Sequence, residues 1–259
     1  MSKSTSINWK LFSILLAASI LSVIAVLPYA FALQGDVLKS IPLSLPLVVL
    51  LSIIQSGIVF VICIFVGLSL SKKVGFESPV VDDWEMTKIR VRSVFGISTT
   101  LGVLSGTVII ALDFIFSKLG SSLSLDQIQI PMWKSFLASF YGGIGEEILL
   151  RLFLMTFLVW VFFKIKKTKD NKPTDTGIWL ALLISSFLFG LAHLPTTSAI
   201  VAITPLILLR AVLLNGIGGV VFGWLYWKKG LESAMIAHFS ADIILHVVFP
   251  LFPSFPLTG

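Results

Sequence analysis

The sequence predicts an all-α fold: a polytopic bundle of seven transmembrane helices, with eight as the alternative. Of the 259 residues, 56% are hydrophobic and only 12% are charged, whereas a soluble domain carries about 25% charged residues. The mean hydropathy is +1.01, and charges are sparse along the whole chain rather than in one segment. Several apolar runs reach the length of about 20 residues that crosses a bilayer as a helix. We therefore expect residues 1–259 to form a single integral membrane domain.

The individual spans follow from the apolar runs, which are too long and too continuous for the short alternating strands of a membrane barrel. Two of them are longer than one crossing needs, and glycine clusters (Gly142, Gly143 and Gly145, then Gly216, Gly218 and Gly219) could break either, which gives the eight-span alternative. The seven runs are 11–33, 45–70, 94–116, 133–163, 177–194, 199–227 and 231–252.

Basic residues predict the orientation. The net charge of +6 comes from short clusters after alternate spans, a pattern that reports membrane topology rather than nucleic-acid binding. With the N-terminus in the cytoplasm, the clusters face the cytoplasm, and the absence of organelle signals favours a prokaryotic plasma membrane. Ala30-Phe31-Ala32 resembles a signal-peptide cleavage site, but the first run is longer than a signal-peptide core, so a retained first span is favoured. The second span is followed by Lys72, Lys73, Lys88, Arg90 and Arg92, the fourth by Lys164, Lys166, Lys167, Lys169 and Lys172, and the sixth by Lys228 and Lys229.

The fourth run contains charges that do not belong in lipid. Glu146 and Glu147 are adjacent, and Arg151 follows Glu147 by four residues. Glu147 and Arg151 can pair on one helix face, which leaves Glu146 about 100° round the helix and free to face another group. An ionisable residue in a span is a functional-site hypothesis by default. The structural alternative is an Arg–Glu link between spans, with Glu146 as a bystander.

Two later runs carry the histidines. His193 stands at the end of the fifth run, four residues after Phe189, and a lone histidine there is more often an interfacial residue than a catalyst. In the last run His238 and Asp242 are four residues apart and share a helix face. This pair can fix one imidazole tautomer or face a common ligand. The structural alternative is a polar pair that holds the last helix in the bundle.

Together the motifs resemble the CAAX prenyl protease and bacteriocin-processing family, also called the Abi family. Its pattern is Glu-Glu-x3-Arg, Phe-x3-His and His-x3-Asn on successive membrane helices. The chain has Glu146-Glu147-x3-Arg151, Phe189-x3-His193 and His238-x3-Asp242 in that order, within a motif-bearing core of about 133–245. The resemblance implies an intramembrane endopeptidase like the type II CAAX prenyl proteases, which cleave prenylated proteins near the C-terminus.

Carried over by position, the resemblance assigns roles to these residues. Glu146 and His193 would activate water, His238 and Asp242 would stabilise the oxyanion, and Glu147 with Arg151, supported by Phe189, would hold the site together. The chain departs from the family pattern at Asp242, because an ionised carboxylate cannot donate a hydrogen bond to an oxyanion. Asp242 would have to be protonated, orient His238 or bind metal.

Metal dependence stays open at this point. Glu146, His193 and His238 would offer zinc the nitrogen and oxygen ligands of a catalytic site, but no H-E-x-x-H helix is present. A water activated by glutamate and histidine needs no cofactor, and this mechanism is preferred, with zinc as the alternative. The expected partners are membrane lipid and a hydrophobic or prenylated peptide or protein substrate, not nucleic acid.

Two other functions remain as alternatives. One is a non-catalytic membrane regulator or bacteriocin-immunity protein that uses the same cleft for binding. The other is a proton-coupled or metal transporter, which would predict inverted repeats that the sequence does not show. A geometrical tension also remains: counted along straight helices, Glu147 and His193 lie about 24 Å deep and His238 about 10 Å deep. Tilted helices or an eighth span would remove the discrepancy.

Overall fold

The computed structural model describes residues 7–35, 41–76, 79, 83–121 and 130–252, and in these ranges the chain is helical, with one isolated bridge between Lys167 and Pro173. Seven helices are long and apolar enough to cross a membrane, which confirms the predicted polytopic bundle of seven spans. The helices are α1 (Trp9–Leu33), α3 (Leu45–Val74), α4 (Trp84–Lys118), α5 (Met132–Phe140), η2 (Tyr141–Glu146), η3 (Ile148–Met155), α6 (Thr156–Ile165), α7 (Asp175–Ala192), α8 (Leu194–Ser198), α9 (Pro205–Lys229), α10 (Leu231–Asp242), η4 (Ile243–Val248) and η5 (Phe249–Leu251).

The helix α4 begins well before the apolar run at 94–116. Asp83 caps it, accepting hydrogen bonds from the backbone N–H groups of Glu85 at 2.9 Å and Met86 at 3.1 Å. A side chain that satisfies free N–H groups in the first turn is the usual start of a helix. The polar residues between Trp84 and Arg92 therefore extend the helix beyond the apolar span rather than forming a loop.

Neither glycine cluster breaks its span. In the fourth span, α5, η2, η3 and α6 follow one another directly, and the segments η2 and η3 are π-helical, with wider turns than an α-helix. In the sixth run, the interruption falls before the glycines, between α8 and Thr204, and α9 continues unbroken from Pro205. Within the described ranges, no eighth helix of spanning length is present.

Small residues bring α4 and α10 into close contact. The hydroxyls of Ser98 and Ser233 lie 2.6 Å apart, and one turn later a side chain on Gly102 would overlap the backbone carbonyl of Ala237. Helices in membranes approach closely where such small residues repeat every four positions. This contact fixes one face of α10 against α4 and leaves another face, with His238 and Asp242, for the fourth span.

A second close contact joins α7 to α9. An added Cβ at Gly190 would lie 2.6 Å from the Cα of Val212, and one at Gly219 would lie 2.8 Å from the Cβ of Ser186. The two backbones therefore touch where a side chain would separate them. The contact brings Phe189 of α7 and Phe222 of α9 toward the same part of the core.

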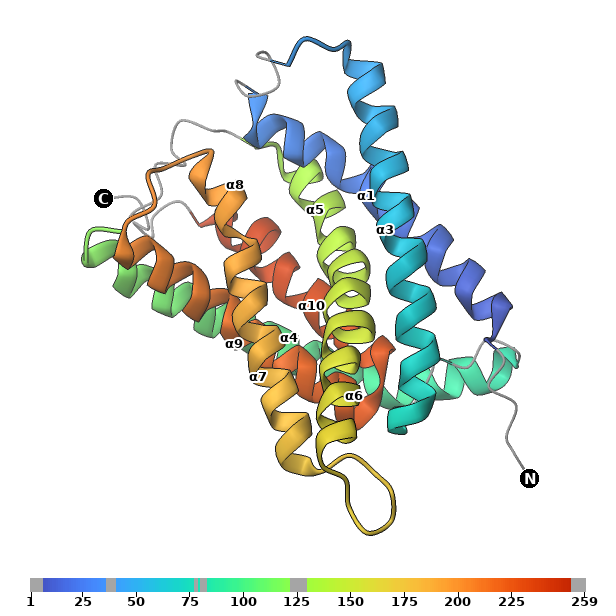
Figure 1. The fold of residues 1–259 in the computed structure, drawn as a ribbon. Coiled ribbons are helices and arrows are strands. Elements are labelled where there is room, and N and C mark those ends of the chain that lie inside the picture. Colours follow the sequence, from blue (N-terminus) through green and yellow to red (C-terminus); the bar gives the residue numbers. More distant parts are fainter. Residues whose placement is uncertain (1–6, 36–40, 77–78, 80–82, 122–129, 253–259) are drawn as a thin grey trace.

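The helices do not all run in the same direction. In Figure 1, α4, α9 and α10 run obliquely to the upright helices α3, α5–α6 and α7. Residues counted along α10 therefore do not measure position along the upright helices, and His238 reaches Glu147, with Nδ1 2.7 Å from Oε1.

Candidate active site

The centre of the site is a buried ion pair. Glu147, between η2 and η3, is 0% exposed and Arg151 is 2% exposed. Their atoms Oε1 and Nη1 lie 3.1 Å apart, as the spacing of four residues predicts. Arg151 also donates through Nη2 to the backbone oxygen of Gly219 at 3.1 Å, which links the fourth span to α9.

Aromatic rings enclose the guanidinium. The Cζ atom of Arg151 lies 5.1 Å from the ring centre of Phe189 and 5.6 Å from that of Phe222. A cation over an aromatic face is stabilised further when it is desolvated. The pair is therefore surrounded by protein from three spans, and removing one charge would leave the other buried without compensation.

Glu147 also holds His238. The distance between Oε1 of Glu147 and Nδ1 of His238 is 2.7 Å, so Nδ1 donates its proton to the carboxylate. The imidazole stacks on the ring of Phe222 at 4.6 Å, with an interplanar angle of 21°, and meets the edge of Phe189 at 5.7 Å. A carboxylate on one nitrogen and rings on both sides fix the orientation of the imidazole and the direction of Nε2.

The free nitrogen of His238 faces two further carboxylates. Its Nε2 lies 3.7 Å from Oε2 of Glu146 and 3.7 Å from Oδ1 of Asp242. Both distances are longer than a direct hydrogen bond. The side chains of Glu146 and Asp242 are 23% and 15% exposed, whereas Glu147 is fully enclosed. Glu146 is therefore the glutamate of the pair that a small molecule can reach.

Gly142 makes this convergence possible. A side chain there would overlap the Asp242 carboxylate and lie 3.2 Å from Nε2 of His238. At Gly143, an added Cβ would lie 2.9 Å from the Cβ of Phe239 in α10. The glycines therefore let the backbone of η2 form one wall of the site. In the sequence alone, these glycines indicate only a possible break in the helix.

His193 lies at the edge of this cluster. Its Nδ1 is 2.9 Å from the backbone oxygen of Phe189, so Nδ1 donates and Nε2 keeps its lone pair in the neutral ring. The ring lies edge-on to Phe189 at 4.8 Å, and Phe189 thus contacts both His193 and His238. Among the described residues, no ion pair joins His193 to Glu146.

The metal set suggested by the sequence is not assembled. In the described ranges no three His, Cys, Asp or Glu side chains are arranged to hold a metal ion. Zinc ligands must converge on one point about 2.0–2.2 Å from each donor atom, and His193 is held toward the backbone of α7.

Sequence reasoning missed some contacts and anticipated others. It gave no role to Phe222, because a phenylalanine in an apolar helix carries no distinguishing signal. An arginine within an apolar span is expected either to pair with a carboxylate or to extend to the interface. Arg210 pairs with Asp113 at 2.6 Å between Nε and Oδ1, away from the site and between α9 and α4.

Part of the chain matches a family of known proteins. Residues 128–244 match the family model of the type II CAAX prenyl endopeptidase Rce1-like proteins. No curated protein and no solved structure gave a match. The matched segment includes the paired glutamates, Arg151, His193, His238 and Asp242. Over residues 128–244, a little under half of the chain, the protein is therefore similar to the type II CAAX prenyl endopeptidase Rce1-like family.

Proposed function

We propose that this protein is an intramembrane endopeptidase that hydrolyses a peptide bond in a hydrophobic or lipidated substrate by means of water activated by glutamate and histidine. The observation that carries the proposal is the position of His238, whose Nδ1 lies 2.7 Å from the buried Glu147 and whose Nε2 faces Glu146 and Asp242 at 3.7 Å. A carboxylate–imidazole pair that presents one nitrogen to a second, accessible carboxylate is suited to acid–base chemistry.

Glu146 is the proposed general base. It accepts a proton from water, the water oxygen attacks the carbonyl carbon of the scissile bond, and the proton then passes to the departing amine nitrogen. Its partial exposure supports this role, because the base must reach the water it activates. His193 is the proposed second proton acceptor, because its Nε2 carries a lone pair. It assists Glu146 once substrate lies between the two side chains.

His238 is the proposed electrophile. With Nδ1 donating to Glu147, Nε2 donates to the developing oxyanion when the ring carries both protons, and a fixed donor of this kind stabilises the transition state. Asp242 lies beside Nε2 and fills the space above Gly142. These contacts favour an orienting role for Asp242 over direct donation to the oxyanion. Glu147, Arg151 and Phe189 hold His238 in place.

The surroundings of the site favour an apolar substrate. The catalytic groups lie within helices that are long and apolar enough to cross a membrane, so a peptide must enter from the bilayer or carry a hydrophobic anchor. We further propose that the N-terminus is cytoplasmic in a prokaryotic plasma membrane. The ends of α3, α6 and α9, where the basic clusters lie, are on the same side of the bundle in Figure 1, as the positive-inside rule requires.

The test is cleavage of a fluorogenic lipidated peptide by the full chain in nanodiscs, with products identified by mass spectrometry. We expect Glu146→Gln to lower the rate about 10²- to 10⁴-fold, the usual contribution of a general base, and His193→Ala to lower it by a smaller factor. The matched control is Asp113→Asn, which removes an intramembrane carboxylate outside the site.

Further measurements distinguish the metal-free protease from a metalloprotease and from a non-catalytic protein. Each variant is assayed with chelator and after zinc addition. Activity that is lost to chelator and restored by zinc would replace the metal-free mechanism with a metalloprotease. If no form cleaves any of a panel of hydrophobic peptides, and Glu146→Gln matches the wild type in cells, the protease proposal fails. The protein would then be a non-catalytic regulator or immunity protein that binds in the same cleft.

A further inference from the structure

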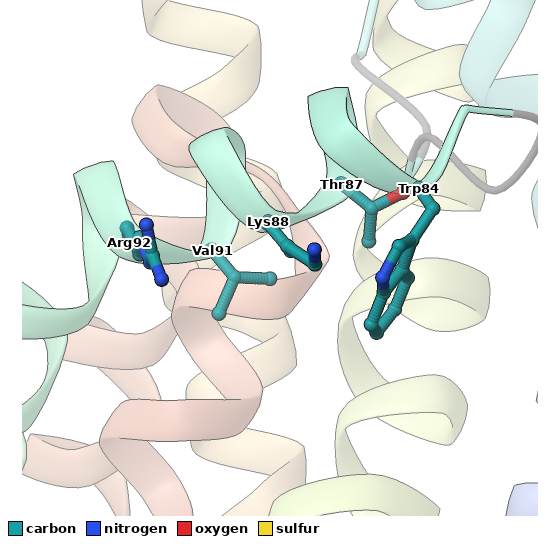
Figure 2. Close-up of a pocket in the computed structure, with 5 residues that line it drawn as sticks. All are labelled: Trp84, Thr87, Lys88, Val91 and Arg92. Carbon is teal, nitrogen blue, oxygen red and sulfur yellow. The ribbon is translucent and has the colours of Figure 1, made fainter.

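A shallow hollow lies on the first turns of α4, away from the catalytic cluster. Its volume is about 210 Å³ and its lining residues all come from this one helix. Figure 2 shows the side chains projecting from the same side of α4, as expected for residues spaced by three and four positions. The lining consists of Trp84, Thr87, Lys88, Val91 and Arg92.

The charged groups of the hollow are both basic. Arg92 is exposed and makes no ion pair within the described part of the chain. Lys88 lies 2.8 Å from Glu85, but that carboxylate is 74% exposed, and an exposed pair contributes little because water screens it. The surface of the hollow itself is almost entirely apolar, so both cations lie at its edge, where an anion can reach them. The neighbouring Arg90 is different, because it pairs with Glu232 at 2.9 Å.

The hollow lies at the end of a membrane span. The helix α4 has 35 residues, more than the roughly 20 that cross the hydrocarbon, and its charged residues are concentrated before Ser93. Trp84 is 69% exposed, and Lys88 Nζ lies 5.3 Å from its ring centre. An exposed tryptophan beside basic residues, just outside an apolar span, is typical of the headgroup region of a bilayer.

From these observations we propose that this hollow and the two cations at its edge, together the α4 headgroup site, bind an anionic phospholipid, with its apolar part against the hollow and its phosphate at the cations. Lys88 and Arg92 bind the phosphate oxygens, and the Trp84 indole lies beside them at the level of the lipid glycerol. Arginine and lysine are the usual partners of phosphate. The basic helix ends on the same side of the bundle favour a leaflet rich in anionic lipid. The proposal is independent of the proteolytic function, because it concerns binding alone.

The test measures phosphatidylglycerol bound to the full chain by native mass spectrometry, against phosphatidylcholine as the neutral lipid. The test variant is Lys88→Gln/Arg92→Gln. The matched control, Lys169→Gln/Lys172→Gln, removes the same charge from the loop between α6 and α7. A basic residue near an anionic surface changes affinity about five-fold, so we expect the test variant to bind phosphatidylglycerol at least about ten-fold more weakly. The control should change less than about two-fold.

Three results would overturn the proposal. Equal losses in the two double variants would show that diffuse surface charge, not a site, attracts the lipid. Equal binding of the two lipids by the wild type would show no preference for an anion. Stronger binding of an acidic peptide than of phosphatidylglycerol would make the hollow a docking site for protein. Both double variants must keep the wild-type unfolding temperature. Trp84→Ala, which alters no charge, provides a second test, and we expect it to weaken phosphatidylglycerol binding about three-fold.

Discussion

At the scale of single residues, Glu147 has the most constrained environment in the site. One oxygen, Oε1, contacts both Nη1 of Arg151 at 3.1 Å and Nδ1 of His238 at 2.7 Å. The other, Oε2, is buried without a hydrogen-bond partner among the described groups. The stability of the pair and the orientation of His238 therefore depend on the same atom.

Mutations can separate the two roles of Glu147, which are stabilising the ion pair and orienting His238. Glu147→Gln leaves Arg151 charged and buried, which should lower the free energy of unfolding by about 3–5 kcal/mol. Glu147→Gln/Arg151→Met removes both charges and should recover most of that loss. Activity should stay about 10- to 100-fold low in the double variant, because His238 lacks its carboxylate. Unfolding in detergent and peptide cleavage measure the two effects, and a double variant with full activity would contradict the orienting role.

Gly142 provides a second residue-scale prediction. An added methyl group would meet Asp242 and lie 3.2 Å from Nε2 of His238, so Gly142→Ala should displace the reacting groups. We expect kcat to fall about 10- to 100-fold with little change in KM. The control is Gly57→Ala in α3, where nothing lies within 4 Å of the added atom. A fall in stability without a selective fall in kcat would assign Gly142 to packing alone.

The sequence predicts the side-chain pairs within one helix but not the pairs between helices. Glu147 with Arg151, and His238 with Asp242, follow from a spacing of four residues. The bond between His238 and Glu147 does not, because it depends on the oblique course of α10 and on the close contact at Gly142. Residue spacing also does not predict the position of the His193 ring, whose Nδ1 contacts the backbone of Phe189.

At the scale of the elements, the position of the last helix depends on its contact with α4. Ser98 and Gly102 of α4 face Ser233 and Ala237 of α10, and a wider separation would move His238 away from Glu147. The apolar runs predict that both helices exist. Their contact follows only from the small residues that lie opposite one another.

Two glycines on α4 test this contact. Gly102→Ala should destabilise the fold by about 1–3 kcal/mol, because the new methyl group overlaps the Ala237 carbonyl. Gly96→Ala meets nothing within 4 Å and should be neutral or stabilising by up to about 1 kcal/mol, since alanine favours the helix. Thermal unfolding in detergent compares the two. Equal effects would mean that α4 and α10 are not in close contact at Gly102.

The start of α4 shows where the hydropathy criterion is insufficient. The apolar run predicts a helix from residue 94, but the helix begins at Trp84. The missing signal was local: Asp83 followed by Glu85 is a typical helix start. Apolar runs locate the part of a helix that lies in lipid, and capping residues locate where the helix begins.

At the scale of the whole molecule, alternate helix ends carry the basic clusters, which predicts the orientation. In a variant with Cys63→Ser, a single cysteine at Asp170 should be protected from a membrane-impermeant maleimide in intact cells. A single cysteine at Ala199, on the other side, should be labelled. Both sites are exposed in the structure, so lysed cells should label both. The reverse pattern in intact cells would place the N-terminus outside.

The central claim is that Glu146, beside a His238 oriented by buried Glu147, activates water for peptide hydrolysis. Its most direct test is the single-turnover rate of cleavage of a lipidated peptide with excess enzyme, comparing wild type with Glu146→Gln. The account predicts a fall of about 10²- to 10⁴-fold while peptide affinity and unfolding temperature stay at their wild-type values. A Glu146→Gln protein that cleaves at the wild-type rate would contradict the claim.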